Sequence, residues 1–201
     1  LDRVQVSHSE MEQLVLASGI EPHKVHRIPI GLHCDWFPLV TPERRARARQ
    51  ALGLPPDAFV IGSFVKDGSG WRDGDTPKYI KGPDLLLAVA ERLRGRIPHL
   101  IFLLSGPARG YVKKGLERLR IAYRHVCVDR YREMARLYHA ADVCLITSRQ
   151  EGGPKAVLEA MAAGIPLVTT RVGQAMDLVR HRENGWMANV EDVEALVAGV
   201  L

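Results

Sequence analysis

The chain has 201 residues, 46% of them hydrophobic and 25% charged, and it is long enough to bury the core of a single domain. It contains no apolar run of transmembrane length and no signal-peptide pattern, so we expect a cytoplasmic protein that does not span a membrane. Its 28 Lys and Arg residues against 23 Asp and Glu residues give a net charge of +5, which leaves anionic partners open.

Apolar or β-branched runs alternate along the chain with segments of helical periodicity. The expected strands are residues 25–30, 59–65, 100–105, 126–128, 143–147 and 167–170. The expected helices are residues 83–94, 112–123, 133–140 and 154–163, followed by a helical pattern over 190–201. This order predicts an α/β fold with a parallel sheet and helices on both of its faces, in which ligands bind beyond the carboxyl ends of the strands.

Two basic clusters, in residues 44–49 and 113–124, account for much of the excess positive charge. The sequence has no nucleic-acid recognition motif and an aromatic content of only 6%, which favours solvated helix faces over a surface for nucleic acid. A basic domain that binds nucleic acid or anionic membranes stays open as an alternative, and a steep salt dependence of binding would reveal it.

A long glycine-rich loop follows the second expected strand. It spans residues 65–82 and contains the cations Lys66, Arg72 and Lys81. The loop lacks the Gly-Lys-Ser/Thr ending of a P-loop, and its glycines miss the spacing of the dinucleotide fingerprint. It therefore places positive charge beyond the end of a strand without either of these phosphate-binding motifs.

The three cysteines, Cys34, Cys127 and Cys144, include no Cys-x-x-Cys pair, and the eight histidines are scattered along the chain. An odd cysteine count without close spacing argues against a disulfide framework and against a zinc site. We therefore expect buried, reduced thiols, no metal site and no bound cofactor.

Residues 148–166, SRQEGGPKAVLEAMAAGIP, are the most informative part of the chain. Their two glutamates, Glu151 and Glu159, stand eight positions apart on either side of a Gly-Gly-Pro turn. Pro154 suits the first position of a helix, and Gly164 suits its C-cap. The spacing therefore places one carboxylate in the turn before the helix and the other on the helix itself.

The turn before this helix is suited to an anion. Gly152 and Gly153 have no Cβ atom, so a ligand can approach their backbone closely. The unpaired N–H groups of the first helical turn and the positive end of the helix dipole attract a phosphate. These residues alone leave two interpretations open, an anion site or a loop that merely opens a helix.

Taken together, these motifs resemble the donor-site signature of the retaining glycosyltransferases of family 4, also called group 1. The likeness includes both glutamates and the Glu-Ala-Met-Ala-x-Gly-x-Pro continuation after the second. It extends to IPIGLHCDWFP at residues 28–38, LGLP at 52–55, KGPDLL at 81–86 and TTRVG at 169–173, which follow in family order. The resemblance covers nearly the whole chain and implies a Rossmann-like domain that is one half of a two-domain GT-B enzyme.

The resemblance also implies roles for individual residues. Glu151 would face the donor sugar, Glu159 would bind the ribose hydroxyls, and Lys66 and Lys81 would neutralise the donor diphosphate. Lys66 stands where the family has an arginine, and Arg72 is a nearby cation that could compensate. The other donor-binding candidates are Gly153, Pro154, Lys155, Ala156 and Arg130, the last of them in the segment 128–131 where the base pocket is expected.

The implied activity is that of a hexosyltransferase-type enzyme that uses a nucleoside diphosphate sugar and needs no metal. Residues 1–201 would be its C-terminal, donor-binding half, and the acceptor would bind a missing N-terminal half, so the fragment alone is expected to be inactive. Gly153 stands where many members have an aromatic residue, so the wall beside the sugar is expected to be more open or differently shaped. A non-catalytic nucleotide-binding module remains an alternative, and peripheral membrane association of the full enzyme stays open.

Overall fold

A computed structural model describes residues 2–71 and 74–201 of the chain, and a six-stranded parallel sheet forms its centre. The strands lie in the order β5-β4-β3-β6-β7-β8 and are all parallel. Successive strands are added on one side of β3 up to β5 and on its other side from β6, so the strand order reverses between β3 and β6. Their bounds are β3 (Phe59–Phe64), β4 (Leu100–Ser105), β5 (Ala122–Val126), β6 (Val143–Ile146), β7 (Leu167–Thr170) and β8 (Trp186–Ala188). The predicted parallel α/β sheet is confirmed.

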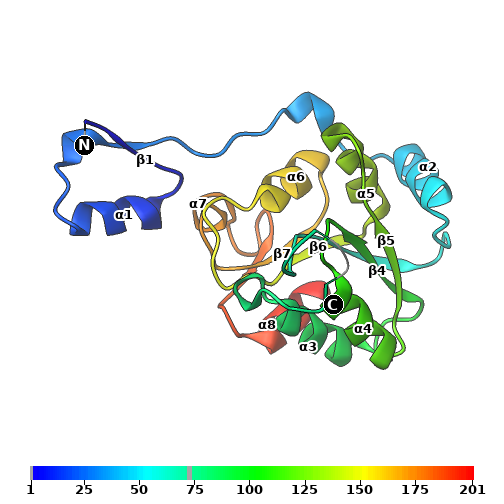
Figure 1. The fold of residues 1–201 in the computed structure, drawn as a ribbon. Coiled ribbons are helices and arrows are strands. Elements are labelled where there is room, and N and C mark those ends of the chain that lie inside the picture. Colours follow the sequence, from blue (N-terminus) through cyan, green and yellow to red (C-terminus); the bar gives the residue numbers. More distant parts are fainter. Residues whose placement is uncertain (1, 72–73) are drawn as a thin grey trace.

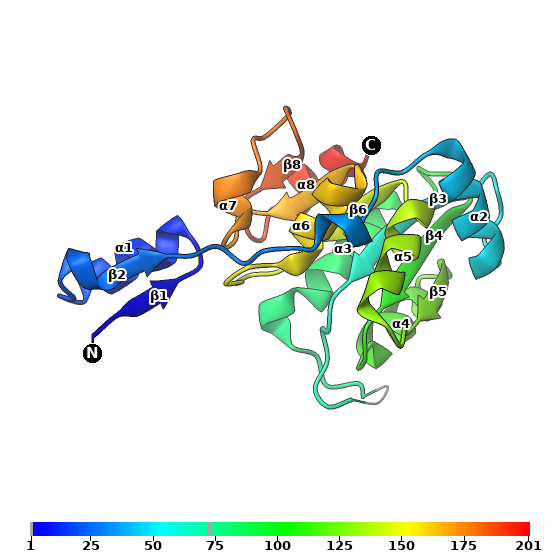
Figure 2. The same ribbon diagram turned by 90° about the horizontal axis from the view of Figure 1, so that it is seen from above.

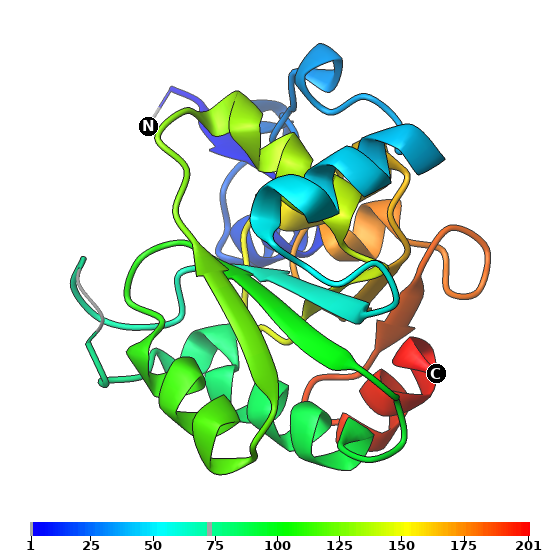
Figure 3. The same cartoon turned by 90° about the vertical axis from the view of Figure 1, so that its right-hand side faces the viewer.

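Helices cover both faces of this sheet (Figures 1 and 3). One face carries α3 (Pro83–Leu93), α4 (Gly110–Arg118) and α8 (Val193–Val200). The other face carries α2 (Pro42–Leu52), α5 (Met134–Ala140) and α6 (Lys155–Ala163), and a short helix, α7 (Ala175–Leu178), follows β7. None of the helices in the described part of the chain has the length and the apolar character that crossing a bilayer requires.

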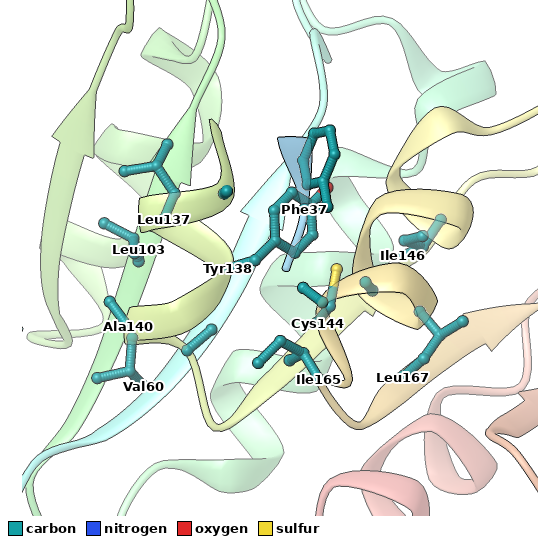
Figure 4. Close-up of a cluster of buried hydrophobic side chains, with 14 of the residues drawn as sticks. Phe37, Val60, Leu103, Leu137, Tyr138, Ala140, Cys144, Ile146, Ile165 and Leu167 are labelled. Atoms are coloured by element: carbon teal, nitrogen blue, oxygen red, sulfur yellow. The ribbon is translucent and has the colours of Figure 1, made fainter. Parts of the chain in front are cut away.

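Each face of the sheet has its own hydrophobic core, as expected for strands that are buried on both sides. The core under α2, α5 and α6 contains Phe37, Leu103 and Tyr138, none more than 1% exposed (Figure 4). The core under α3, α4 and α8 contains Leu86 and Phe102, which are equally inaccessible to solvent. Burying a large apolar side chain contributes about 1.5–3 kcal/mol, so these two layers fix the sheet as a rigid support for the loops at its edge.

A small unit at the N-terminal end of the chain projects from this body (Figures 1 and 2). It consists of β1 (Val4–Val6), α1 (Ser9–Ala17) and β2 (Val25–Arg27), and its two strands form a separate parallel sheet. The expected strand over residues 25–30 therefore exists only in part and does not join the main sheet. The elements β1, α1, α7 and β8 were not expected from the sequence, because each is short or weakly patterned.

The expected elements between β4 and α5 are shifted in the structure. We expected a helix over 112–123 and a strand over 126–128, whereas α4 ends at Arg118 and β5 occupies Ala122–Val126. Arg120 adopts a positive φ of 53°, which stops the helix. Because β5 is an edge strand that contains Arg124 and His125, its residues lack the apolar run that identifies a buried strand.

Candidate functional site

A cavity of about 570 Å³ opens where the loops after β3, β4, β5 and β6 meet at the carboxyl edge of the sheet. This is the point where the strand order reverses, and parallel α/β sheets bind ligands at such a point. Eight of the predicted site residues line the cavity: Lys66, Lys81, Glu151, Gly153, Pro154, Lys155, Ala156 and Glu159. From the expected base pocket, Val128 and Tyr131 line it and Arg130 does not, and Arg72 lies outside the described residues.

Lys81 and Glu151 form an ion pair inside this cavity. The Lys81 Nζ atom lies 2.6 Å from Glu151 Oε2, and the Ser148 hydroxyl donates to Glu151 Oε1 over 2.8 Å. Both side chains are partly shielded from solvent, with exposed fractions of 29% and 12%. A charge-assisted hydrogen bond in such a place is strong and directional, so it holds the carboxylate and the ammonium in a defined geometry.

The two loops that carry this ion pair are joined by Arg149. Its guanidinium makes a bidentate pair with Asp84 over 2.8 and 2.7 Å and donates to the Tyr79 carbonyl over 2.6 Å. The Arg149 backbone N–H donates to Ile80 over 2.9 Å. These hydrogen bonds to Arg149 hold the pKa of Asp84 below its ordinary value. The segment before Lys81 and the segment before Glu151 are thus fixed to each other.

The N-terminus of α6 faces the same cavity. Lys155 and Ala156 open the helix, so their backbone N–H groups have no partner within it. Pro154 is the residue before the helix and not its first member, one position from the expected start, and Gly164 ends the helix with a φ of 70° as expected. Helix-end positions commonly differ by one residue, so the turn lies where it was expected, and its binding of an anion stays a prediction.

The space beside Gly153 is filled by other residues of the chain, which fits the expectation of a differently shaped wall and not that of a more open one. A Cβ atom at position 153 would lie 2.3 Å from Ile30 Cδ1 and 3.0 Å from Gln174 Oε1. Gln174 in turn accepts from the Ile30 N–H and donates to the Ile30 carbonyl, each over 3.0 Å. A residue distant in sequence therefore fills the space that an aromatic side chain at position 153 would need.

Lys66 lines the cavity at the end of β3 and stacks on an aromatic ring. Its ammonium lies 3.9 Å from the centroid of the Trp71 ring, which is 81% exposed. Such cation–π contacts at exposed sites are weak, about 0.5–1 kcal/mol, so the ammonium can exchange this ring for an anion at little cost.

A buried ion pair lies beneath the Lys66 loop, and the sequence did not point to it. Arg109 has no exposed surface, and its Nε atom lies 3.1 Å from a carboxylate oxygen of Asp67, which is 1% exposed. Arg109 also donates to the carbonyls of Ser63, Val65 and Ser105 over 2.7, 2.9 and 3.0 Å. Burial raises the pKa of Asp67, and the charge of Arg109 opposes that rise.

Glu159 has its carboxylate between two tyrosines. The Tyr138 hydroxyl donates to Glu159 Oε2 over 2.5 Å, and the Tyr131 hydroxyl donates to Oε1. The carboxylate is almost fully buried, and Tyr131 lines the cavity beside it. Burial and the hydrogen bond to Glu159 raise the pKa of Tyr131, so both tyrosines keep their protons and act as donors.

Most arginines of the basic cluster in residues 44–49 make hydrogen bonds or ion pairs with other parts of the chain. Arg49 is buried and lies 2.6 Å from Asp142, which also pairs with Arg45. Arg44 donates to the Leu39 carbonyl over 2.6 Å. Arg45 and Arg49 attach α2 to Asp142 in the loop before β6, so these two are less solvated than the sequence suggested, whereas the exposed Arg44 bonds to the segment before α2.

The cysteines differ from expectation, because only Cys144 is buried while Cys34 and Cys127 are exposed. Burial raises the pKa of the Cys144 thiol well above its ordinary value, so this group stays protonated. Within residues 2–71 and 74–201, no group of three His, Cys, Asp or Glu side chains is arranged to hold a metal ion.

Comparison with known proteins agrees with this geometry. Residues 74–201 match the family model described as glycosyl transferases group 1. The chain is 29% identical to a D-inositol 3-phosphate glycosyltransferase 2 of Catenulispora acidiphila and 30% identical to a D-inositol 3-phosphate glycosyltransferase of Corynebacterium urealyticum. Each alignment covers 96% of this chain and 46% of the relative, so the chain spans about half the length of these curated relatives.

Solved structures show the same fold. Sucrose-phosphate synthase from Thermosynechococcus elongatus has 26% identity and a TM-score of 0.76 over 99% of this chain and 48% of its own. HepE from Anabaena, solved in complex with UDP and glucose, has 23% identity and a TM-score of 0.80 over 99% of this chain and 52% of its own. The Rossmann-like domain of GT-B type that the resemblance implied is confirmed, and the chain belongs to the group 1 glycosyltransferases.

Proposed function

We propose that this chain is the donor-binding domain of a retaining glycosyltransferase, which holds a nucleoside diphosphate sugar while its sugar passes to an acceptor. The observation that carries the proposal is the Lys81–Glu151 ion pair beside the N-terminus of α6. Together these groups form one cavity with positive charge for a diphosphate and a carboxylate for sugar hydroxyls. Glu159 lies on the same helix and is placed to receive a ribose.

In this proposal the lysines and the helix N-terminus stabilise the leaving group. As the bond between sugar and phosphate breaks, negative charge grows on the diphosphate, and preorganised donors at that position lower the barrier. Lys66, Lys81 and the first N–H groups of α6 supply this positive charge, so no metal ion is required. Glu151, held by Lys81 and Ser148, faces the donor sugar.

For the donor and the acceptor, the proposal names only the class of molecule and where it would bind. HepE was solved with UDP and with UDP-glucose, so UDP-glucose is the first donor to test and UDP the first nucleotide. The acceptor would bind to a second, N-terminal half, and the reaction would take place between the two halves in the cytoplasm. A nucleotide-binding module without transfer activity is the competing function, and turnover by the full-length enzyme separates the two.

Calorimetric titration of the chain with UDP, GDP and ADP tests the proposal. We expect at least one of these nucleotides to bind at one site per chain. Binding should be lost on replacing Lys81 and Glu159 together, because one is assigned to the diphosphate and the other to the ribose. A chain that binds none of the three nucleotides would contradict the proposed function.

Lys81→Ala and Lys66→Ala should each weaken binding of the nucleoside diphosphate by about 1–3 kcal/mol, because a charged hydrogen bond to phosphate is lost. Affinity for the bare nucleoside should stay unchanged, since neither lysine is assigned to the base or ribose. Titrations at low and high salt check this, and the loss should shrink at high salt if the site is open to solvent. Equal losses for nucleoside and diphosphate would indicate a folding defect instead.

Glu159→Ala should weaken binding of the nucleoside diphosphate by about 1–3 kcal/mol, because the ribose loses a charged acceptor in a nearly buried position. Inorganic pyrophosphate has no ribose, so its affinity should not change and it serves as the control ligand. Calorimetry on both ligands makes the comparison. Unchanged affinities for UDP, GDP and ADP would show that the ribose assignment is wrong.

Residues 1–201 by themselves should bind the donor nucleotide without transferring sugar, because the acceptor is assigned to a second half. The curated relatives are about twice as long as the matched region, in keeping with this expectation. Release of UDP from UDP-glucose in the presence of inositol phosphate acceptors is the measurement. Sustained turnover by this chain would refute the assignment of the acceptor.

A further inference from the structure

Glu159 is a buried carboxylate, and each of its two oxygens accepts a hydrogen bond from a tyrosine. Its exposed fraction is 4%, Tyr138 donates to one oxygen, and Tyr131 donates to the other. A buried carboxylate that lacks a donor is strongly destabilising, because it has lost its water without a replacement. The two hydroxyls therefore stabilise this carboxylate within the fold.

The two tyrosines have different surroundings. Tyr138 is fully buried, and its ring packs edge-on against Phe64 at 4.6 Å and Phe37 at 6.0 Å between centroids. Tyr138 therefore forms part of the core, and it holds Glu159 Oε2 permanently. This hydrogen bond fixes the orientation of the carboxylate on α6.

Tyr131 lies at the rim of the cavity and is 37% exposed. It belongs to a single 3₁₀ turn, Tyr131–Glu133, in the loop after β5, and its ring touches Trp36 and Phe37 edge-on at 5.9 and 5.6 Å. The Lys155 ammonium lies 5.2 Å from the ring centroid. A partly exposed side chain on a short surface turn loses few contacts when it changes rotamer, here the edge contacts with Trp36 and Phe37, whereas Tyr138 is enclosed by the core.

We propose that the Tyr131 hydroxyl and a ribose hydroxyl compete for the same oxygen of Glu159, so that Tyr131 must leave this oxygen when the nucleotide binds. The inference rests on the proposed function, because it takes Glu159 as the ribose acceptor. Tyr131 keeps the buried carboxylate satisfied when no ligand is present. The same hydrogen bond competes with the ribose, so Tyr131 lowers the affinity of the domain for its donor.

Tyr131→Phe tests this competition, and the matched change Tyr138→Phe is its control. Phenylalanine keeps the ring contacts with Trp36 and Phe37 and removes only the hydroxyl. A net hydrogen bond of about 0.5–1.5 kcal/mol corresponds to a factor of about two to ten, so Tyr131→Phe should bind UDP that much more tightly. Tyr138→Phe should bind UDP more weakly, because Glu159 loses its fixed orientation.

Two further measurements separate competition from a structural role. Affinity for inorganic pyrophosphate, which has no ribose, should be the same for the wild type and Tyr131→Phe. In the absence of ligand, Tyr131→Phe should have a lower melting temperature than the wild type, because Glu159 has lost a donor. A variant that is less stable when empty and yet binds UDP more tightly cannot be explained by a general loss of structure.

Weaker or unchanged UDP binding by Tyr131→Phe would overturn the inference, since the hydroxyl would then contact the nucleotide or play no part. If UDP does not bind to Tyr131→Phe while the wild type binds it, the inference alone is refuted. If the wild type binds none of UDP, GDP and ADP, the proposed function fails, and the inference fails with it.

Discussion

Gly82→Ala is expected to lower the free energy of unfolding by about 3–5 kcal/mol, the sum of left-handed backbone strain and overpacking. Gly82 has a φ of 62°, and a Cβ atom on it would lie 1.8 Å from the backbone oxygen of Thr147. The Thr147 hydroxyl also donates to the Gly82 carbonyl over 2.8 Å. The contact joins the residue after Lys81 to the end of β6, so its loss should also separate Lys81 from Glu151.

Gly53→Ala is the matched control for this change. Gly53 has nearly the same φ, 64°, but a Cβ atom there would have no neighbour within 4 Å. In urea denaturation, the free energy of unfolding of this variant should fall by only about 1–2 kcal/mol, the cost of placing alanine in the left-handed region. Similar losses in the two variants would show that the backbone contact with Thr147 contributes nothing.

Arg109→Met is expected to destabilise the chain by about 3–5 kcal/mol, because it leaves the buried Asp67 carboxylate without its counter-charge. The substitution also removes the donor that joins the carbonyls at the ends of β3 and β4. Denaturation of Arg109→Met and of the double variant Arg109→Met/Asp67→Leu measures the two contributions. The double variant should recover part of the loss, because no unpaired charge remains.

The pH dependence of stability gives a second test of this pair. Burial raises the pKa of Asp67 in the folded state, so its contribution to stability falls as the pH rises above the ordinary aspartate value of about 4. Arg109 opposes that rise in pKa, and its removal should make stability fall more steeply between about pH 4 and 7. Parallel pH profiles of the wild type and Arg109→Met would indicate that the charge of Arg109 is unimportant.

The residues of the cavity were predictable where they depend on local spacing. Pro154, Gly164 and the two glutamates belong to one turn and one helix, so the sequence alone places them relative to each other. Lys81 was predictable from the resemblance of Lys81-Gly82 to the Lys-Gly loop of the group 1 glycosyltransferases. The assignments of these residues to sugar, ribose and diphosphate remain predictions.

The residues that hold the loops and the Glu159 carboxylate of the cavity in place could not be predicted, because they come together only in the tertiary fold. Arg109 and Asp67 come from loops 42 residues apart, and each would be assigned to solvent from its sequence neighbours alone. Tyr131 lies in the turn after β5 and Tyr138 in α5, and both donate to Glu159 on α6. Ile30, in the segment that follows β2, likewise fills the space beside Gly153, a contact between distant parts of the chain that hydrophobic periodicity does not predict.

The small unit of β1, α1 and β2 has a consequence for hydrogen exchange. No residue of helix α1 is fully buried, and a two-stranded sheet is marginal when isolated. Its amide protons should therefore exchange through local opening, whereas those of β3 and β6 exchange only when the whole sheet unfolds. Ser7 donates to the Gly152 carbonyl over 3.3 Å, so each opening event breaks this hydrogen bond to the loop that carries Glu151. The Gln174 N–H still donates to the same carbonyl, and Lys81 and Ser148 still hold Glu151, so that loop should keep its protection while the small unit exchanges.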